Sequence, residues 1–360
     1  MQHLIRVIPL LLFMACQPEK ADQLRLNEIQ LIGSHNSYKI RIEQPLLDLL
    51  IREDSGAIGL DYAHLSLVKQ LDLGIRGLEL DVLYDPDGGA FTKPKGIEIL
   101  DSLGLKALPY DTMPLLKPGF KVFHIPDIDF RSHCLTFKGC LNRIKEWSKN
   151  HPEHIPIIVT INPKNSGVNQ PGFTRVVPFN RLVLDSLDKE ITEVFSDEEL
   201  ITPLQVKGVH EYLRDAILEK GWPALDSVRG RVLFVLDAGS DVTKDYLTEQ
   251  DYSKPMFVNV DENHPQAGFF IINDPVAMED VIKDRVAKGF MVRTRSDANT
   301  KEARTTDYTR FEAAKRSGAH LISTDYYLNE LSAGKDFKII FNNDGYARCN
   351  PVAGNSSCEL

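Results

Sequence analysis

The chain has 360 residues, and 42% of them are apolar, so it can bury one large core or two ordinary ones. A net charge of −9 and a pI near 5.6 argue against a nucleic-acid-binding protein, which would need a basic face. The same charge argues against broad electrostatic capture on an anionic membrane.

The first 16 residues are expected to be an export signal and not part of the fold. Residues 1–6 carry a positive charge, and the apolar run at 8–14 is too short to span a bilayer. The ending Phe13-Met14-Ala15-Cys16 resembles a bacterial lipoprotein signal, with Cys16 as the lipid-bearing residue. An ordinary signal peptide is the alternative. We therefore expect an exported protein, either anchored in the bacterial envelope through Cys16 and a polar tether at 17–28, or secreted.

Four further cysteines are expected to form disulfides, because an even number in an exported chain is typical of such bonds. Proximity favours Cys134–Cys140 and Cys349–Cys358, although four cysteines permit three pairings. The chain has no Cys-x-x-Cys pair, which argues against a zinc ribbon or a thioredoxin-type site.

Alternating strand and helix patterns predict an α/β fold with parallel strand pairing. Strands are predicted at 29–33, 75–82, 120–124, 156–161, 231–236, 256–259, 290–294 and 320–324. Helices are predicted at 138–149, 180–195, 209–220, 276–288 and 307–317, and Gly221 and Gly318 resemble helix C-caps. Eight strands without a nucleotide-type glycine loop favour a TIM-type (β/α)8 barrel, regular or irregular, as a single domain at 29–335. A C-terminal extension at 336–360 would follow it, and the intervals 37–74 and 83–119 must hold insertions.

Polar side chains gather where the first three predicted strands end. His35 and Asn36 follow the first strand, Glu79 and Asp81 share one face of the second, and His124 closes the third. Taken alone, a Glu-x-Asp pair is commonly solvated, and a histidine at a strand end is commonly structural. Because the carboxyl ends of TIM-barrel strands carry the chemistry, their joint occurrence favours one site.

These residue types suit phosphodiester cleavage. Asn36, Glu79 and Asp81 offer oxygen ligands, which fit calcium or magnesium, and Asn162 would add an amide oxygen. A dication there would neutralise an anionic substrate. Two histidines can divide the proton work, one accepting from the nucleophile and one donating to the leaving group.

Other polar residues at predicted strand ends are candidates for substrate contact. Lys164 could bind a phosphate, and Arg293 and Arg295 share a strand face from which they could hold an anionic head group. Asp325 follows the last strand and could orient a histidine. The alternatives are a surface lysine for Lys164 and a turn or helix cap for Asp325.

The motifs resemble the bacterial calcium-dependent phosphoinositide-specific phospholipase C family. The resemblance rests on Ile32-Gly33-Ser34-His35-Asn36-Ser37-Tyr38, Leu78-Glu79-Leu80-Asp81-Val82, His124-Ile125-Pro126-Asp127, Val292-Arg293-Thr294-Arg295, Cys134-Leu135-Thr136-Phe137 and Ser323-Thr324-Asp325-Tyr326. It covers roughly residues 25–350. Asp325 and Tyr326, in the last motif, are expected beside the substrate.

The resemblance implies an irregular TIM-type barrel with one calcium ion in its mouth. It also implies cleavage of phosphatidylinositol to diacylglycerol and an inositol phosphate through a cyclic 1,2-phosphate. His35 and His124 would be the catalytic pair, and Asn36, Glu79 and Asp81 the calcium ligands. In the simplest scheme His35 takes the 2-hydroxyl proton and His124 protonates the glycerol oxygen, with a metal-bound carboxylate as the alternative base. Eukaryotic relatives have a glutamate ligand on the strand that ends here in Asn162, so one negative charge is lost.

Two other functions remain open. A glycerophosphodiester phosphodiesterase shares the barrel, the two histidines and the acidic ligands, but it normally begins with His-Arg-Gly where this chain has His-Asn-Ser. A non-catalytic surface lipoprotein that binds a phosphorylated sugar is the second alternative, disfavoured because both histidines are present. No feature of the sequence indicates oligomerisation, so a monomer is expected.

Overall fold

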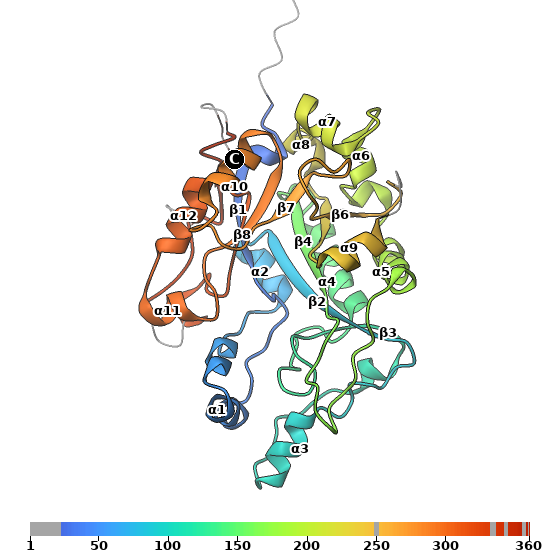
Figure 1. Ribbon diagram of the computed structural model, residues 1–360, viewed down its shortest axis with the longest axis vertical. Coiled ribbons are helices and arrows are strands. Elements are labelled where there is room, and N and C mark those ends of the chain that lie inside the picture. Colours follow the sequence, from blue (N-terminus) through green and yellow to red (C-terminus); the bar gives the residue numbers. More distant parts are fainter. Residues whose placement is uncertain (1–22, 248–251, 332–335, 342–344, 355–357, 359) are drawn as a thin grey trace, which may run out of the picture.

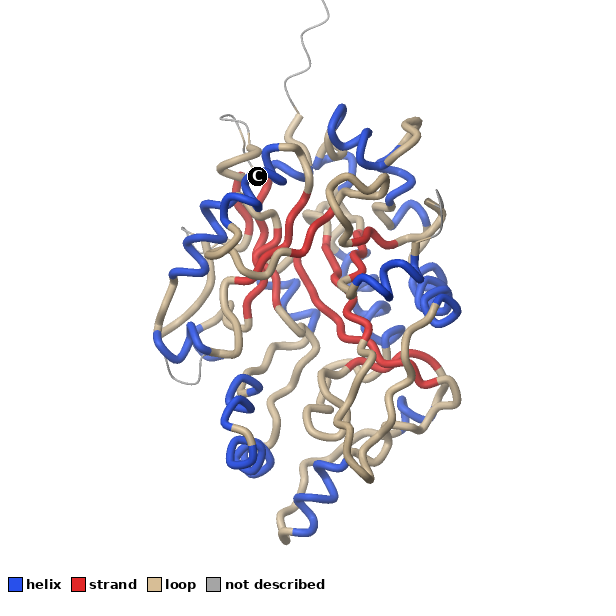
Figure 2. The backbone as a smooth tube through the Cα atoms, viewed as in Figure 1, coloured by secondary structure: helices blue, strands red, loops and turns tan. Residues whose placement is uncertain are grey.

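The structure is a computed structural model that describes residues 23–247, 252–331, 336–341, 345–354, 358 and 360. Its centre is a nearly closed barrel of parallel strands (Figures 1 and 2). The strands follow the order β6-β5-β4-β2-β1-β9-β8-β7, and every pairing along this path is parallel. They are β1 (Ile29–Ser34), β2 (Gly77–Asp85), β4 (Ile157–Pro163), β5 (Val232–Leu236), β6 (Met256–Val258), β7 (Phe269–Ile271), β8 (Met291–Arg295) and β9 (Leu321–Thr324). The barrel stays open between β6 and β7, so the expected TIM-type α/β fold is confirmed in an irregular form.

One predicted barrel strand was wrong. The segment predicted at 120–124 forms β3 (Gly119–Val122), which pairs antiparallel with the outer half of β2, with Val122 opposite Val82. β2 has nine residues and extends beyond the barrel, which gives β3 an edge to join. The eighth barrel strand is β7, a strand of three residues that was not predicted.

Helices cover the outside of the barrel, and the predicted ones correspond to α4, α5, α7, α10 and α12 (Figure 1). The helices are α1 (Gln44–Glu53), α2 (Leu67–Leu73), α3 (Lys95–Ser102), α4 (Phe137–Asn150), α5 (Arg181–Val194), α6 (Pro203–Lys207), α7 (Leu213–Lys220), α8 (Leu225–Val228), α9 (Ser240–Tyr246), α10 (Glu279–Ala287), α11 (Lys301–Thr305) and α12 (Thr309–Ser317). Gly221 and Gly318 end α7 and α12 with φ of 70° and 76°, as the sequence predicted. No helix in the described part of the chain is long and apolar enough to cross a membrane.

The predicted insertions extend the barrel at its carboxyl end. The interval 37–74 contains α1 and α2, and the interval 83–119 contains α3. α1 and α3 pack together through a small apolar cluster that includes Leu46 and Leu100. Figure 1 shows both helices projecting beyond the ends of the barrel strands.

Both ends of the described chain are tied to the barrel. The expected signal at 1–16, with Cys16, lies outside the described residues, but the expected tether at 17–28 is folded near its end: Leu26–Glu28 is a 3-10 helix with Leu26 fully buried. In the expected extension, β10 (Ala347–Cys349) pairs antiparallel with β1. The disulfides Cys134–Cys140 and Cys349–Cys358 are both present, which confirms the pairing that proximity favoured.

Candidate active site

The register of β1 and β2 sets the centre of the site. Gly33 lies opposite Gly77, and a Cβ on Gly77 would be 2.9 Å from the Gly33 Cα and 2.1 Å from a Leu321 methyl carbon. The two strands therefore meet at a point where neither has a side chain. Two residues further along, His35 and Glu79 lie side by side, with His35 Nε2 3.9 Å from Glu79 Oε1.

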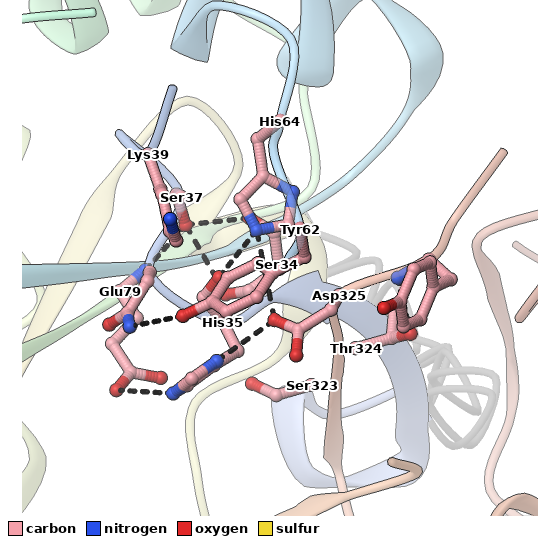
Figure 3. Close-up of polar contacts among 12 residues, drawn as sticks. Ser34, His35, Ser37, Lys39, Tyr62, His64, Glu79, Ser323, Thr324 and Asp325 are labelled. Carbon is pink, nitrogen blue, oxygen red and sulfur yellow. Dashed lines mark hydrogen bonds and ion pairs between the residues drawn. The ribbon is translucent and has the colours of Figure 1, made fainter. Parts of the chain in front are cut away.

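His35 is held by a buried carboxylate. Its Nδ1–H donates to Asp325 Oδ1 at 2.9 Å (Figure 3). The Asp325 backbone N–H donates in turn to Asp297 Oδ1 at 2.9 Å. Nε2 therefore has no proton in the neutral ring and points toward Glu79. Burial and the nearby Arg295 guanidinium lower the pKa of His35 well below its usual value. His35 is thus placed to accept a proton.

His124 is held in the same way by a second buried carboxylate. Its Nδ1–H donates to Asp129 Oδ2 at 2.8 Å, and Lys39 Nζ donates to Asp129 Oδ1 at 2.8 Å. Asp129 is fixed by a tight turn, because its backbone exchanges hydrogen bonds with that of Ile125. Asp127 makes this turn possible with a φ of 74°. Burial raises the pKa of Asp129, but Lys39 and His124 outweigh burial and hold it below its usual range.

Oxygen atoms without hydrogen-bond donors lie beside the two histidines. Asn36 has a φ of 49°, and its Nδ2 donates to the Tyr62 hydroxyl at 2.7 Å. Among the described residues, Asn36 Oδ1 and both Asp81 carboxylate oxygens are buried and accept no hydrogen bond. Buried oxygens that accept no hydrogen bond are the ligands that calcium prefers, so the donor set fits the expected ion.

Basic side chains stand near the carboxylates in this structure. Lys164 Nζ lies 3.1 Å from Asp81 Oδ2, and Arg293 donates from Nη2 to Glu79 Oε2. No group of three histidine, cysteine or carboxylate side chains is arranged for a metal in the described part of the chain. The expected calcium ligands include only two carboxylates, Glu79 and Asp81, and the other ligands are asparagine amides. Asn162 is half-buried and lies opposite Asp81 in the β2–β4 register.

The remaining predicted residues divide into two groups. Arg295 and Asp325 lie at the site, with Arg295 Nη2 3.6 Å from Asp325 Oδ2. Arg293 also belongs to the site but is enclosed, since it donates to Glu79, Asn273 and Ser323 and is 1% exposed. The prediction that Tyr326 contacts the substrate finds no support. Its side chain is 2% exposed and packs edge-on against Phe337 in the core.

Several residues at the site were not predicted from the sequence. Lys39 and Asp129 belong to the His124 cluster, and Asp297 supports Asp325. Asp237 follows β5 and lies 3.7 Å from Arg293, and burial raises its pKa to about 6. The only signal for Asp129 was its place in a Pro-Asp turn just after His124. Lys39 gave no signal, because a lysine in a loop is normally solvated.

Two histidines, each held by its own buried carboxylate, lie near buried oxygen atoms that fit a cation. His35 follows the barrel strand β1, and His124 follows β3, which pairs with the outer half of β2. This arrangement defines a class: a metal-assisted acid–base hydrolase on an irregular TIM barrel.

Comparisons with known proteins identify the family. The sequence profile of the Ca2+-dependent phosphoinositide phospholipase C family matches residues 24–351. The calcium-dependent phosphoinositol-specific phospholipase C of a Gram-negative Pseudomonas species is 17% identical with a TM-score of 0.54, over 91% of this chain and 96% of that one. The Ca2+-dependent enzyme of Streptomyces antibioticus is 16% identical with a TM-score of 0.52, over 86% of this chain and 97% of that one. A search of curated proteins gives no significant match. The chain belongs to the Ca2+-dependent phosphoinositide phospholipase C family, whose members are phosphodiesterases.

Proposed function

We propose that this chain is a monomeric, calcium-dependent phosphodiesterase that cleaves phosphatidylinositol or a related phospholipid to diacylglycerol and an inositol phosphate. One observation carries the proposal. His35 and His124 lie at one mouth, and each has its Nδ1–H fixed by a buried carboxylate. A sugar-binding protein has no need for two histidines held in this way.

In the proposed reaction, the inositol 2-oxygen attacks phosphorus and the bond from phosphorus to the glycerol oxygen breaks. His35 Nε2 takes the 2-hydroxyl proton, and His124 gives a proton to the departing oxygen, which leaves a cyclic 1,2-phosphate. Water then opens the ring with the two roles reversed. Glu79, 3.9 Å from His35 Nε2, is the alternative base.

Asn36, Glu79 and Asp81 would hold the calcium ion, with Asn162 as a further ligand. Bound there, calcium would neutralise the phosphate charge and lower the pKa of a coordinated hydroxyl. Lys164 and Arg295 would contact the phosphate, since their side chains remain partly exposed. The enclosed Arg293 would instead position Glu79.

Exposed apolar side chains at the mouth support a lipid substrate. They lie between α3 and β3 and are Leu103, Leu105, Leu108, Met113 and Leu116. The segment is anchored to the His124 loop, because Gly96 N–H donates to the Asp127 carbonyl oxygen at 2.7 Å and Arg131 donates to the Leu108 carbonyl oxygen at 2.9 Å. The chain is acidic overall, so contact with a lipid surface must come mainly from such apolar groups.

A double variant, Leu108→Ser with Met113→Ser, tests this lipid contact. We expect about 10–100-fold slower cleavage of phosphatidylinositol in vesicles, because two side chains of this size each contribute about 1.5 kcal/mol when buried. Hydrolysis of soluble inositol 1,2-cyclic phosphate should be unchanged.

The matched control is Leu204→Ser with Val209→Ser, which are 50% and 92% exposed near α6, at the opposite end of the barrel (Figure 1). This control should cleave both substrates normally. Equal losses on vesicles and on the soluble ester would contradict the lipid contact. A preference for glycerophosphoinositol over phosphatidylinositol would favour the glycerophosphodiesterase alternative.

We further propose that the protein is exported and anchored in the bacterial envelope by a lipid on Cys16. The described chain begins just before β1, at the end of the barrel opposite the mouth (Figure 1). An anchor there would turn the mouth away from the anchoring membrane. Cys16→Ala should move the protein from the membrane fraction to the soluble fraction of expressing cells. Unchanged fractionation would contradict the anchor.

A further inference from the structure

Lys39 is a fully buried cation that the proposed reaction does not use. Its side chain is 0% exposed, and its Nζ lies 2.8 Å from Asp129 Oδ1 and 4.8 Å from the centre of the Tyr62 ring. Removing a lysine from water is costly unless its charge is paired, and breaking such a pair leaves an uncompensated buried charge. The ammonium group is thus committed to one partner, the carboxylate that holds His124.

We propose that Lys39 is a positioning residue for the proton donor His124 and acts through Asp129. The two oxygens of Asp129 have separate tasks: Oδ1 accepts from Lys39, and Oδ2 accepts from His124 Nδ1, both at 2.8 Å. Because Lys39 fixes Oδ1, the carboxylate cannot rotate away from the imidazole. The other ring nitrogen, Nε2, is then the one that faces a substrate. This inference rests on the proposed function, in which His124 protonates the leaving group.

The backbone of Lys39 connects the donor to the loop that carries His35. The Lys39 backbone N–H donates to the Asn36 carbonyl oxygen at 2.9 Å. The Lys39 carbonyl oxygen accepts from the backbone N–H of His64 at 3.0 Å. His64 Nε2 in turn lies 2.6 Å from the His35 carbonyl oxygen (Figure 3). One residue therefore sets the position of His124 relative to the loop after β1.

The proton acceptor His35 has a different basic side chain near its carboxylate. Arg295 Nη2 lies 3.6 Å from Asp325 Oδ2, and Asp325 holds His35. Each histidine thus has a carboxylate, and each carboxylate has a separate basic residue. Loss of Lys39 should therefore impair proton donation and leave proton acceptance intact.

The test compares two leaving groups. Phosphatidylinositol expels an alkoxide that needs a proton, whereas 4-nitrophenyl inositol phosphate expels a phenolate that is stable without one. We expect Lys39→Met to lower kcat on phosphatidylinositol in detergent micelles by about 10–100-fold, a part of the effect of general acid catalysis. On the aryl ester the loss should be under about threefold, because that reaction needs little general acid catalysis. Asp325→Asn, on the acceptor side, should slow both substrates alike.

A double variant separates an effect on proton donation from an effect on folding. Lys39→Met with Asp129→Asn leaves no unpaired buried charge, and it should show the same substrate-selective loss with a normal melting temperature. His124→Ala is the reference for a missing proton donor. One outcome would be that His124→Ala slows cleavage of phosphatidylinositol but not of the aryl ester, while both Lys39 variants cleave the two substrates normally. That result would overturn the inference about Lys39 and leave the proposed function standing. If His124→Ala slows both esters equally, His124 is not the proton donor, and the role of Lys39 falls with it.

Discussion

Replacement of either His35 or His124 by alanine is expected to lower kcat on phosphatidylinositol by about 10³-fold or more, while the protein stays folded. In each of these two rings, a buried carboxylate fixes the Nδ1–H, which leaves Nε2 to exchange a proton. Removal of one histidine leaves the other without its partner in the transfer. Steady-state kinetics with saturating calcium measures the loss.

Two controls separate chemistry from folding. An asparagine at either position keeps an N–H donor near the place of Nδ1, so His35→Asn and His124→Asn should preserve the melting temperature better than alanine while remaining inactive. His210 lies between α6 and α7, at the far end of the barrel, where it contacts Glu219. His210→Ala should keep full activity. Full activity in either active-site variant would show that the site is wrongly assigned.

The second large effect is expected from Asp81→Asn. This change removes one of only two carboxylates in the proposed ligand set, so we expect calcium affinity to fall about 10–100-fold. Calorimetric titration with calcium measures binding without relying on turnover. Activity should recover partly at high calcium concentration.

Lys164→Met should act in the opposite direction. Lys164 Nζ lies 3.1 Å from Asp81 Oδ2, so it competes with a cation for that oxygen. Its removal should strengthen calcium binding, even though phosphate contact and turnover suffer. Unchanged calcium affinity in Asp81→Asn would exclude Asp81 as a ligand. Weaker binding in Lys164→Met would contradict the competition between lysine and calcium.

The core of the site was predictable because it depends on short-range rules. Glu79 and Asp81 share a face because alternate residues of a strand do so, and His35 and Asn36 follow β1 at the end where barrel enzymes place their chemistry. The Gly33–Gly77 contact that aligns β1 with β2 is visible only in three dimensions.

The supporting residues were not predictable, because their roles depend on distant contacts. Lys39 and Asp129 are 90 residues apart, and Arg293 and Glu79 are 214 apart. Tyr326 follows Asp325 directly in the sequence, yet its ring is buried in the core against Phe337, which no local pattern indicates. The barrel strand β7 was also missed, although the equally short β6 was predicted.

The most direct test of the proposed function is the release of water-soluble inositol phosphate from phosphatidylinositol vesicles, measured with calcium and then with a chelator. We predict release with calcium, first as the cyclic 1,2-phosphate, and its loss when calcium is chelated. Restored calcium should restore release, and His124→Ala should release product about 10³-fold more slowly or slower still. Equal release in the presence of the chelator, or no release by the folded protein under either condition, would contradict the assignment of this chain as a calcium-dependent phosphoinositide phospholipase C.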